Sequence, residues 1–243
     1  MARPVIKPHS LIVFDSGIGG FSILRNLLDL PCPLVYFADQ KYFPYGDRDP
    51  LWLESHLTSL AKSFVSSHPL GLVLACNTGT VAAITAIRQS VSYPVIGVEP
   101  VTKPISTYHH PVVWGTPKAL ESARSSSLRS RYGSHIRYYA PPSLPSAIEH
   151  QDFPLIQQIL AQAQIDIGQP DAIGLSCTHF PLVKSLIQQY FPDSVIVEPS
   201  LAVAAQVKQL LFPQGYTPSV TPHLHYISTQ SSVNLKKLAE QYL

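Results

Sequence analysis

The sequence contains few charged residues, few cysteines and no long apolar run. Asp, Glu, Lys and Arg make up 13% of its 243 residues, compared with about 25% in a typical soluble domain, whereas 45% of the residues are hydrophobic. This composition excludes the class of disordered proteins, which combine low hydropathy with high charge. The 17 basic residues outnumber the 15 acidic ones only slightly, which argues against a protein that binds nucleic acid mainly by neutralising phosphates. We therefore expect a small-molecule ligand and no requirement for nucleic acid.

The scarcity of cysteine and of apolar runs also bears on the compartment. Three cysteines cannot form an even disulfide framework. The first apolar run, Leu11 to Phe14, stops at Asp15 and is too short for the core of a signal peptide. No run approaches the roughly 18 apolar residues that a membrane span requires. These absences predict a cytoplasmic protein with no membrane role.

Short aliphatic runs alternate with longer amphipathic segments, a pattern typical of parallel sheets flanked by helices. The strand candidates are mostly continuous apolar runs, as expected for strands buried on both faces. They lie at 11–14, 34–38, 71–75, 95–98, 112–115, 136–140, 172–176, 195–198 and 224–228. Helical spacing occurs at 21–30, 51–67, 80–90, 153–165, 182–190, 201–211 and 233–243. Proline-containing breaks at 99–104 and near 199 divide these strands into two groups, so we predict an α/β protein with two sheets.

Three ionisable residues directly follow apolar strand candidates and precede small polar residues: Asp15, Cys76 and Cys177. Ligands of open α/β sheets bind beyond the carboxyl ends of the strands, where these residues must lie. A helix that starts after each thiol would offer amide N–H groups and a positive dipole end, which favour a thiolate. The same groups suit a bound carboxylate, together with the neighbouring Asn77, Thr78 and Thr178.

Several functions are compatible with these residues taken singly. Zinc is disfavoured because no C-x-x-C or H-x-x-x-H pair occurs, so we expect no metal. A thiol hydrolase with Cys177 as nucleophile and His179 as base would leave Cys76 without a role. The DSGIGG segment at 15–20 matches neither common phosphate-binding glycine motif.

Two thiols at equivalent places in two similar groups of strands suggest one base on each face of a ligand. Inversion of a stereocentre by proton transfer needs that arrangement. Asp15 and His179 are candidates to orient or deprotonate the nearer thiol. Their structural alternatives are a helix N-cap for Asp15 and a hydrogen-bonded surface histidine for His179, and each thiol could be a small buried apolar residue.

Six segments make the chain resemble glutamate racemases, of the cofactor-independent aspartate/glutamate racemase family. They span most of the chain in the order typical of that family. They are FDSGIGGFSILRNL at 14–27, YFADQKYFPYGDRD at 36–49, LACNTGTVAA at 74–83, PVIGVEP at 94–100, WGTPKALES at 114–122 and GLSCTHFPL at 174–182.

The resemblance implies two similar three-layer lobes, each a mainly parallel sheet flanked by helices, with the active site between them. Lobe A would comprise 1–98 plus 205–243, and lobe B 99–204. The implied reaction interconverts L- and D-glutamate without a cofactor and supplies D-glutamate for peptidoglycan. The resemblance implies that Cys76, assisted by Asp15, takes the proton of the D-enantiomer, and that Cys177, assisted by His179, takes that of the L-enantiomer.

The resemblance also implies which residues bind substrate. The matching positions are Asp15, Ser16, Pro44, Tyr45, Gly46, Cys76, Asn77, Thr78, Thr116, Cys177, Thr178 and His179. Glu149 lies near the place where the family often has a glutamate that assists the second thiol.

The chain departs from the family at Ala119, where a substrate-binding threonine is usual. This departure keeps two alternatives open: an aspartate or other amino-acid racemase, and a ligand-binding or regulatory relative with weakened catalysis. The low charge is also compatible with a homodimer.

Overall fold

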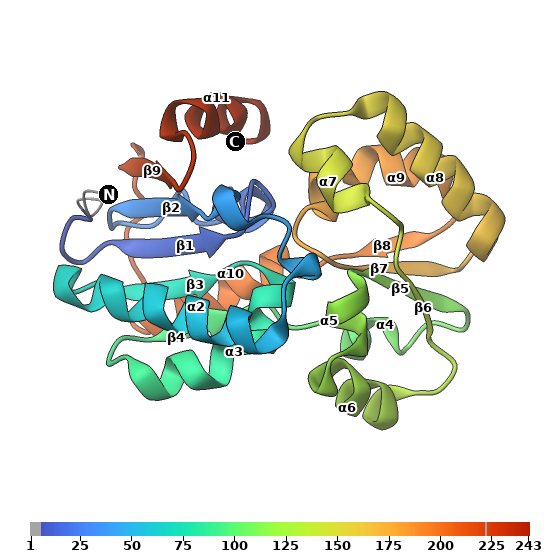
Figure 1. Cartoon of the computed structure of the whole chain (residues 1–243), viewed down its shortest axis with the longest axis horizontal. Helices are drawn as coiled ribbons and strands as arrows, with labels where there is room; N and C mark the ends of the chain where they lie inside the picture. The colour runs from blue at the N-terminus through green and yellow to red at the C-terminus, as the bar shows by residue number, and fades with distance from the viewer. Residues whose placement is uncertain (1–5, 222) are drawn as a thin grey trace. The chain divides into compact units, whose positions relative to one another are not determined.

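The computed structural model describes residues 6–221 and 223–243. It divides the chain into two compact units, Met1–Val98 with Ser200–Leu243, and Glu99–Pro199. Each unit contains one parallel sheet with helices packed around it (Figure 1). The α/β class with two mainly parallel sheets is therefore confirmed. None of the described helices is long and apolar enough to cross a membrane.

The sheet of the first unit has five parallel strands in the order β4-β3-β1-β2-β9. Their bounds are β1 Leu11–Asp15, β2 Leu34–Ala38, β3 Gly71–Leu74, β4 Val95–Gly97 and β9 Leu224–Ser228. The helices of this unit are α1 Phe21–Leu24, α2 Pro50–Phe64, α3 Asn77–Ser90, α10 Ser200–Leu211 and α11 Ser232–Tyr242, with short 3-10 helices η1 Gln40–Tyr42, η2 Tyr45–Asp47 and η3 Val65–Ser67. Asp15 pairs in register with Ala38, and Phe14 with Leu74, so the carboxyl ends of three strands lie at one edge.

The sheet of the second unit has four parallel strands in the order β6-β5-β7-β8. Their bounds are β5 Pro111–Gly115, β6 Arg137–Tyr139, β7 Ala172–Ser176 and β8 Val195–Val197. The helices are α4 Thr102–Ile105, α5 Pro117–Glu121, α6 Ala123–Tyr132, α7 Leu144–Glu149, α8 Phe153–Ile167, η4 Phe180–Val183 and α9 Lys184–Tyr190.

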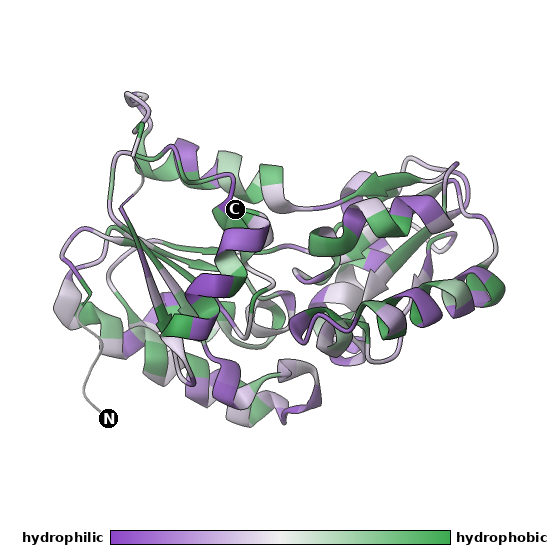
Figure 2. Cartoon of the chain, turned by 90° about the horizontal axis from the view of Figure 1, so that it is seen from above, coloured by the Kyte–Doolittle hydropathy of each residue, from purple (hydrophilic) through white to green (hydrophobic). Residues whose placement is uncertain are grey.

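The helices form where local signals and burial agree. Helix α2 begins after Asp49, whose carboxylate accepts a hydrogen bond from the Trp52 N–H at 2.9 Å, and Pro50 occupies its first turn. Its buried residues recur at helical spacing and pack on the sheet: Leu53, Leu57, Ala61 and Phe64. Figure 2 shows hydrophobic residues along the strands, and both hydrophobic and hydrophilic residues on the helices.

Helix lengths differ from the sequence expectation in several places. The helix expected at 21–30 is only α1, Phe21–Leu24, followed by turns. The helix expected from residue 80 begins at Asn77, directly after Cys76. The helix expected from residue 182 begins at Lys184, because Phe180–Val183 forms a 3-10 turn that contains Pro181. Helices α4, α5 and α7 have only four to six residues, too few for a visible periodicity. Helix α6 has ten, but it is rich in Ser and Arg and its one buried residue is Ser125, so it shows no apolar spacing.

Candidate active site

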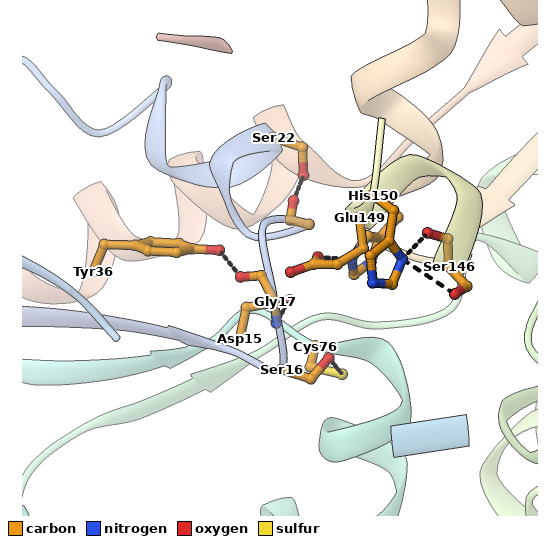
Figure 3. Close-up of polar contacts among 11 residues, drawn as sticks. Asp15, Ser16, Gly17, Ser22, Tyr36, Cys76, Ser146, Glu149 and His150 are labelled. Carbon is orange, nitrogen blue, oxygen red and sulfur yellow. Dashed lines mark hydrogen bonds and ion pairs between the residues drawn. The ribbon is translucent and has the colours of Figure 1, made fainter. Parts of the chain in front are cut away.

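Asp15 lies at the end of β1 and is completely buried. Its Oδ1 accepts a hydrogen bond from the Gly17 N–H at 2.8 Å, so the carboxylate shapes the loop that follows the strand. Gly20, and not Asp15, is the residue that precedes helix α1. The Tyr36 hydroxyl donates to the Gly17 carbonyl at 2.7 Å and holds the same loop (Figure 3). Asp15 is therefore placed by its own turn and is not an N-cap.

Cys76 is the N-cap of helix α3 and is 6% exposed. Its Sγ accepts a hydrogen bond from the Gly79 N–H at 3.4 Å. The Ser16 Oγ lies 3.8 Å from the same sulfur, and Figure 3 shows the two side chains meeting. Amide donors and the positive end of a 14-residue helix are groups that stabilise negative charge on sulfur. The sequence expectation of a thiol at a helix start is confirmed for this residue.

Asn77 presents an unusual pair of polar atoms. Its side chain is buried, and neither Oδ1 nor Nδ2 has a hydrogen-bond partner among the described residues. An unpaired buried amide costs about 1–3 kcal/mol per polar group. Thr78, next to it, is 6% exposed. A polar ligand that pairs with Asn77 would remove this cost.

Tyr45 follows the cis Phe43–Pro44 peptide bond and begins η2. Its ring is buried, and its hydroxyl donates to Asp39 Oδ2 at 2.7 Å. Burial raises the pKa of Tyr45 well above its usual value, and the negative charges of Asp39, Cys76 and Asp15 raise it further. The hydroxyl is therefore protonated over the whole physiological range and acts as a hydrogen-bond donor.

The second unit positions Cys177, Thr178 and His179 directly after β7. All three are buried. His179 Nε2 lies 2.9 Å from Glu149 Oε2, at the end of α7. The predicted helix start is absent here: Cys177 is followed by the short η4, and α9 begins only at Lys184. The expectation that a helix dipole acts on both thiols is therefore wrong for Cys177.

The charge of His179 replaces that dipole in the second unit. Burial by itself lowers the pKa of His179, but the hydrogen bonds and charges of Cys177 and Glu149 outweigh it and raise the pKa well above its usual value. The imidazole is therefore protonated at neutral pH, between a carboxylate and a sulfur atom. A buried imidazolium beside Cys177 is a group that can stabilise a thiolate.

Thr116 caps the short helix α5, where its Oγ1 accepts from the Ala119 N–H at 3.4 Å. Ala119 is buried at this helix start. Pro44 and Gly46 flank Tyr45 in the first unit, with Pro44 as the residue before η2. Among the described residues, no group of three or more His, Cys, Asp or Glu side chains is placed to hold a metal ion.

Sequence reasoning missed two residues of the first unit, Asp39 and His56. Asp39 has the pattern that singled out Asp15, because it directly follows an apolar strand, β2. Its completely buried carboxylate bonds His56 Nε2 at 2.7 Å as well as Tyr45. No local signal marks His56, which lies within helix α2.

Comparison with known proteins gives the following relatives. No protein-family model matches the chain. A glutamate racemase of Pseudomonas syringae pv. tomato is 35% identical over 220 residues, covering 85% of this chain and 80% of that protein. A glutamate racemase of Cupriavidus pinatubonensis is 30% identical and covers 99% of this chain and 93% of its own length. The crystal structure of Escherichia coli glutamate racemase, in complex with L-glutamate and the activator UDP-MurNAc-ala, has a TM-score of 0.81 and 23% identity, and the match covers 98% of this chain and 96% of that chain.

Proposed function

This chain belongs to the glutamate racemase family, and we propose that it interconverts L- and D-glutamate by moving the α-proton between the thiols of Cys76 and Cys177. The activity is that of a cofactor-independent isomerase. The observation that carries the two-thiol mechanism is that each sulfur is buried beside its own charge-stabilising group. The product D-glutamate would supply peptidoglycan synthesis, the role that the family resemblance implies.

In the L-to-D direction, the Cys177 thiolate removes the α-proton and becomes a thiol. The Cys76 thiol donates its proton to the opposite face of the α-carbon and becomes a thiolate. After this turnover Cys177 is a thiol and Cys76 a thiolate, which is the state that the D-to-L direction requires, and in that direction the two thiols exchange roles. The mechanism requires that both sulfur atoms reach one α-carbon from opposite sides.

The neighbouring groups support these steps. The imidazolium of His179, held by Glu149, stabilises the Cys177 thiolate. The Gly79 N–H and the helix α3 dipole stabilise the Cys76 thiolate, and Asp15 assists at that thiol. The unpaired amide of Asn77 binds the polar groups of the substrate, together with Ser16, Thr78 and Thr178.

The test is α-proton exchange by NMR with L- and D-glutamate in deuterium oxide. We expect native protein to place deuterium at the α-position with loss of optical rotation. Cys76→Ser and Cys177→Ser should each lower the racemisation rate by about 10²- to 10⁴-fold, since each removes one proton-transfer group. Cys32→Ser is the matched control, because Cys32 lies between two prolines at the amino end of β2 and not at the carboxyl ends of the strands, and it should keep native activity.

Two results would overturn the proposal in different ways. Exchange with aspartate and none with glutamate would make the chain an aspartate racemase. Full racemisation by either single-thiol variant would exclude the two-thiol mechanism.

We also propose that the protein works in the cytoplasm as a homodimer. The support is compositional: few cysteines and a low share of charged residues. Sedimentation equilibrium measures the oligomeric state directly.

A further inference from the structure

Asp39 is a buried carboxylate with few compensating partners. Its side chain is completely buried, and its backbone N–H donates to the Asp15 carbonyl at 2.9 Å. Oδ2 accepts from the Tyr45 hydroxyl at 2.7 Å and lies 2.7 Å from His56 Nε2. Oδ1 is buried without a hydrogen-bond partner among the described residues. The Tyr45 and His56 side chains therefore supply the hydrogen bonds to this carboxylate.

His56 is held in place by aromatic rings. Its imidazole stacks on Trp52 with ring centroids 4.6 Å apart and an interplanar angle of 11°. Tyr42 meets the same imidazole edge-on at 4.7 Å. The Arg48 guanidinium lies 5.9 Å from the centres of both rings, and the Lys41 ammonium lies 5.4 Å from the Tyr42 ring. The imidazole thus has little rotational freedom, and its Nε2 stays aimed at Asp39.

Tyr45 connects this pair to the candidate active site. Its ring stacks with Phe14 at 6.5 Å, and Phe14 precedes Asp15 on β1. Tyr45 also lies between Pro44 and Gly46, and the family resemblance implies that all three bind substrate. Tyr45, Phe14 and Cys76 also belong to the same buried hydrophobic cluster of the first unit.

We propose that His56 is a positioning residue for racemisation: through Asp39 it fixes the Tyr45 hydroxyl, and so holds the Pro44–Gly46 segment in its substrate-binding conformation. The inference rests on the proposed function, glutamate racemisation, and on the family resemblance that implies substrate binding by that segment. A buried carboxylate needs hydrogen-bond donors to compensate for the water it has lost, and these donors also fix its orientation. Without His56, the Tyr45 hydroxyl is the one remaining side-chain donor that the structure shows for Asp39, so the carboxylate can turn and no longer fixes the Tyr45 hydroxyl.

The test compares His56→Leu, which removes the donor, with His56→Gln, which retains an N–H donor without a titrating ring. We expect His56→Leu to raise KM for glutamate roughly tenfold with kcat changed less than threefold, the loss expected for one charge-assisted hydrogen bond. His56→Gln should restore most of the native KM. Glu54→Leu, at an exposed position of the same helix, is the matched control and should leave KM unchanged.

A second measurement follows Tyr45 without depending on activity. The ¹³Cζ resonance of Tyr45, identified by its absence in Tyr45→Phe, reports the hydrogen bond of the hydroxyl. The chemical shift of this resonance should change in His56→Leu and stay near its native value in His56→Gln. Circular dichroism melting confirms that each variant is folded.

The outcomes separate the inference from the proposed function. If native protein racemises neither glutamate nor aspartate, the proposed function fails, and the Tyr45 resonance alone decides whether His56 holds the hydroxyl. If native protein is active, an unchanged KM in His56→Leu overturns the inference, even where the resonance moves. An equal increase of KM in His56→Leu and His56→Gln also overturns the inference, because loss of the hydrogen bond would then not explain the higher KM.

Discussion

His179 Nε2 lies 2.9 Å from Glu149 Oε2, and only 4% and 6% of these two side chains are exposed. The first unit has no such imidazole beside its thiol among the contacts described, and Cys76 instead receives the Gly79 N–H of helix α3. The two thiols are therefore stabilised by different groups: a charged side chain for Cys177 and the N-terminal end of a helix for Cys76. Substitutions of these groups should affect the two thiols separately.

Glu149→Gln removes the carboxylate charge but keeps a polar group of the same size. Because the Glu149 charge helps to raise the pKa of His179, its loss lowers that pKa. His179 then loses its proton at a lower pH, so we expect the basic limb of the racemisation profile to move toward acid. The profile is measured with the exposed Glu121→Gln as control. If the basic limb of Glu149→Gln stays at the same pH as that of the native protein, Glu149 does not act through His179.

The stability of the protein should depend on pH through His179. Its pKa in the folded protein is raised above the usual value of about 6.5, so its contribution is complete below pH ~6.5 and is lost as the pH rises through the folded pKa. The difference in unfolding free energy between native protein and His179→Gln should thus be largest near pH ~6 and shrink in alkali.

Urea unfolding at several pH values measures this difference. His150→Gln is the matched control, because His150 neighbours Glu149 in sequence but is exposed. A His179→Gln difference that grows with pH would contradict the raised pKa.

Asn77→Leu should stabilise the unliganded protein and abolish glutamate binding. Leucine has nearly the same shape as asparagine and no polar atoms, so the substitution relieves an unpaired amide worth about 1–3 kcal/mol. Thermal unfolding with and without saturating glutamate checks both effects. We expect glutamate to raise the Tm of native protein and of the exposed control Asn234→Leu, but not that of Asn77→Leu. A lower Tm for Asn77→Leu without ligand would mean that the amide is satisfied in solution.

Gly20→Ala tests the loop that carries Asp15. A Cβ on Gly20 would lie 2.9 Å from both the Cε2 and the hydroxyl oxygen of Tyr36. The same Cβ would also lie 3.0 Å from the Asp15 Cβ. The backbone of Gly20 is helical, with φ −63°, so alanine brings no backbone strain and any loss comes from these contacts. We expect a destabilisation of about 1–3 kcal/mol and a displaced Tyr36–Gly17 hydrogen bond.

Chemical denaturation measures the free-energy change, and a racemisation assay reports whether the displaced loop also disturbs Asp15. Native stability in Gly20→Ala would show that Tyr36 and the Asp15 side chain can both move aside without cost.

The sequence alone determined the α/β class and the strand-end positions of Asp15, Cys76 and Cys177. These features depend on local signals: continuous apolar runs for buried parallel strands, and polar residues directly after them. Only the tertiary structure decided which side chains meet. Glu149 reaches His179 from a short helix 30 residues earlier, and His56 reaches Asp39 from 17 residues away. Such pairs depend on how helices pack against a sheet, which no local pattern encodes. The structure likewise shows that an α-helix follows Cys76 directly, whereas a 3-10 turn, Phe180–Val183, follows Cys177 and leads into α9 at Lys184. A 3-10 turn at the start of an α-helix has the same apolar spacing in the sequence as the helix itself, so only the structure separates the two.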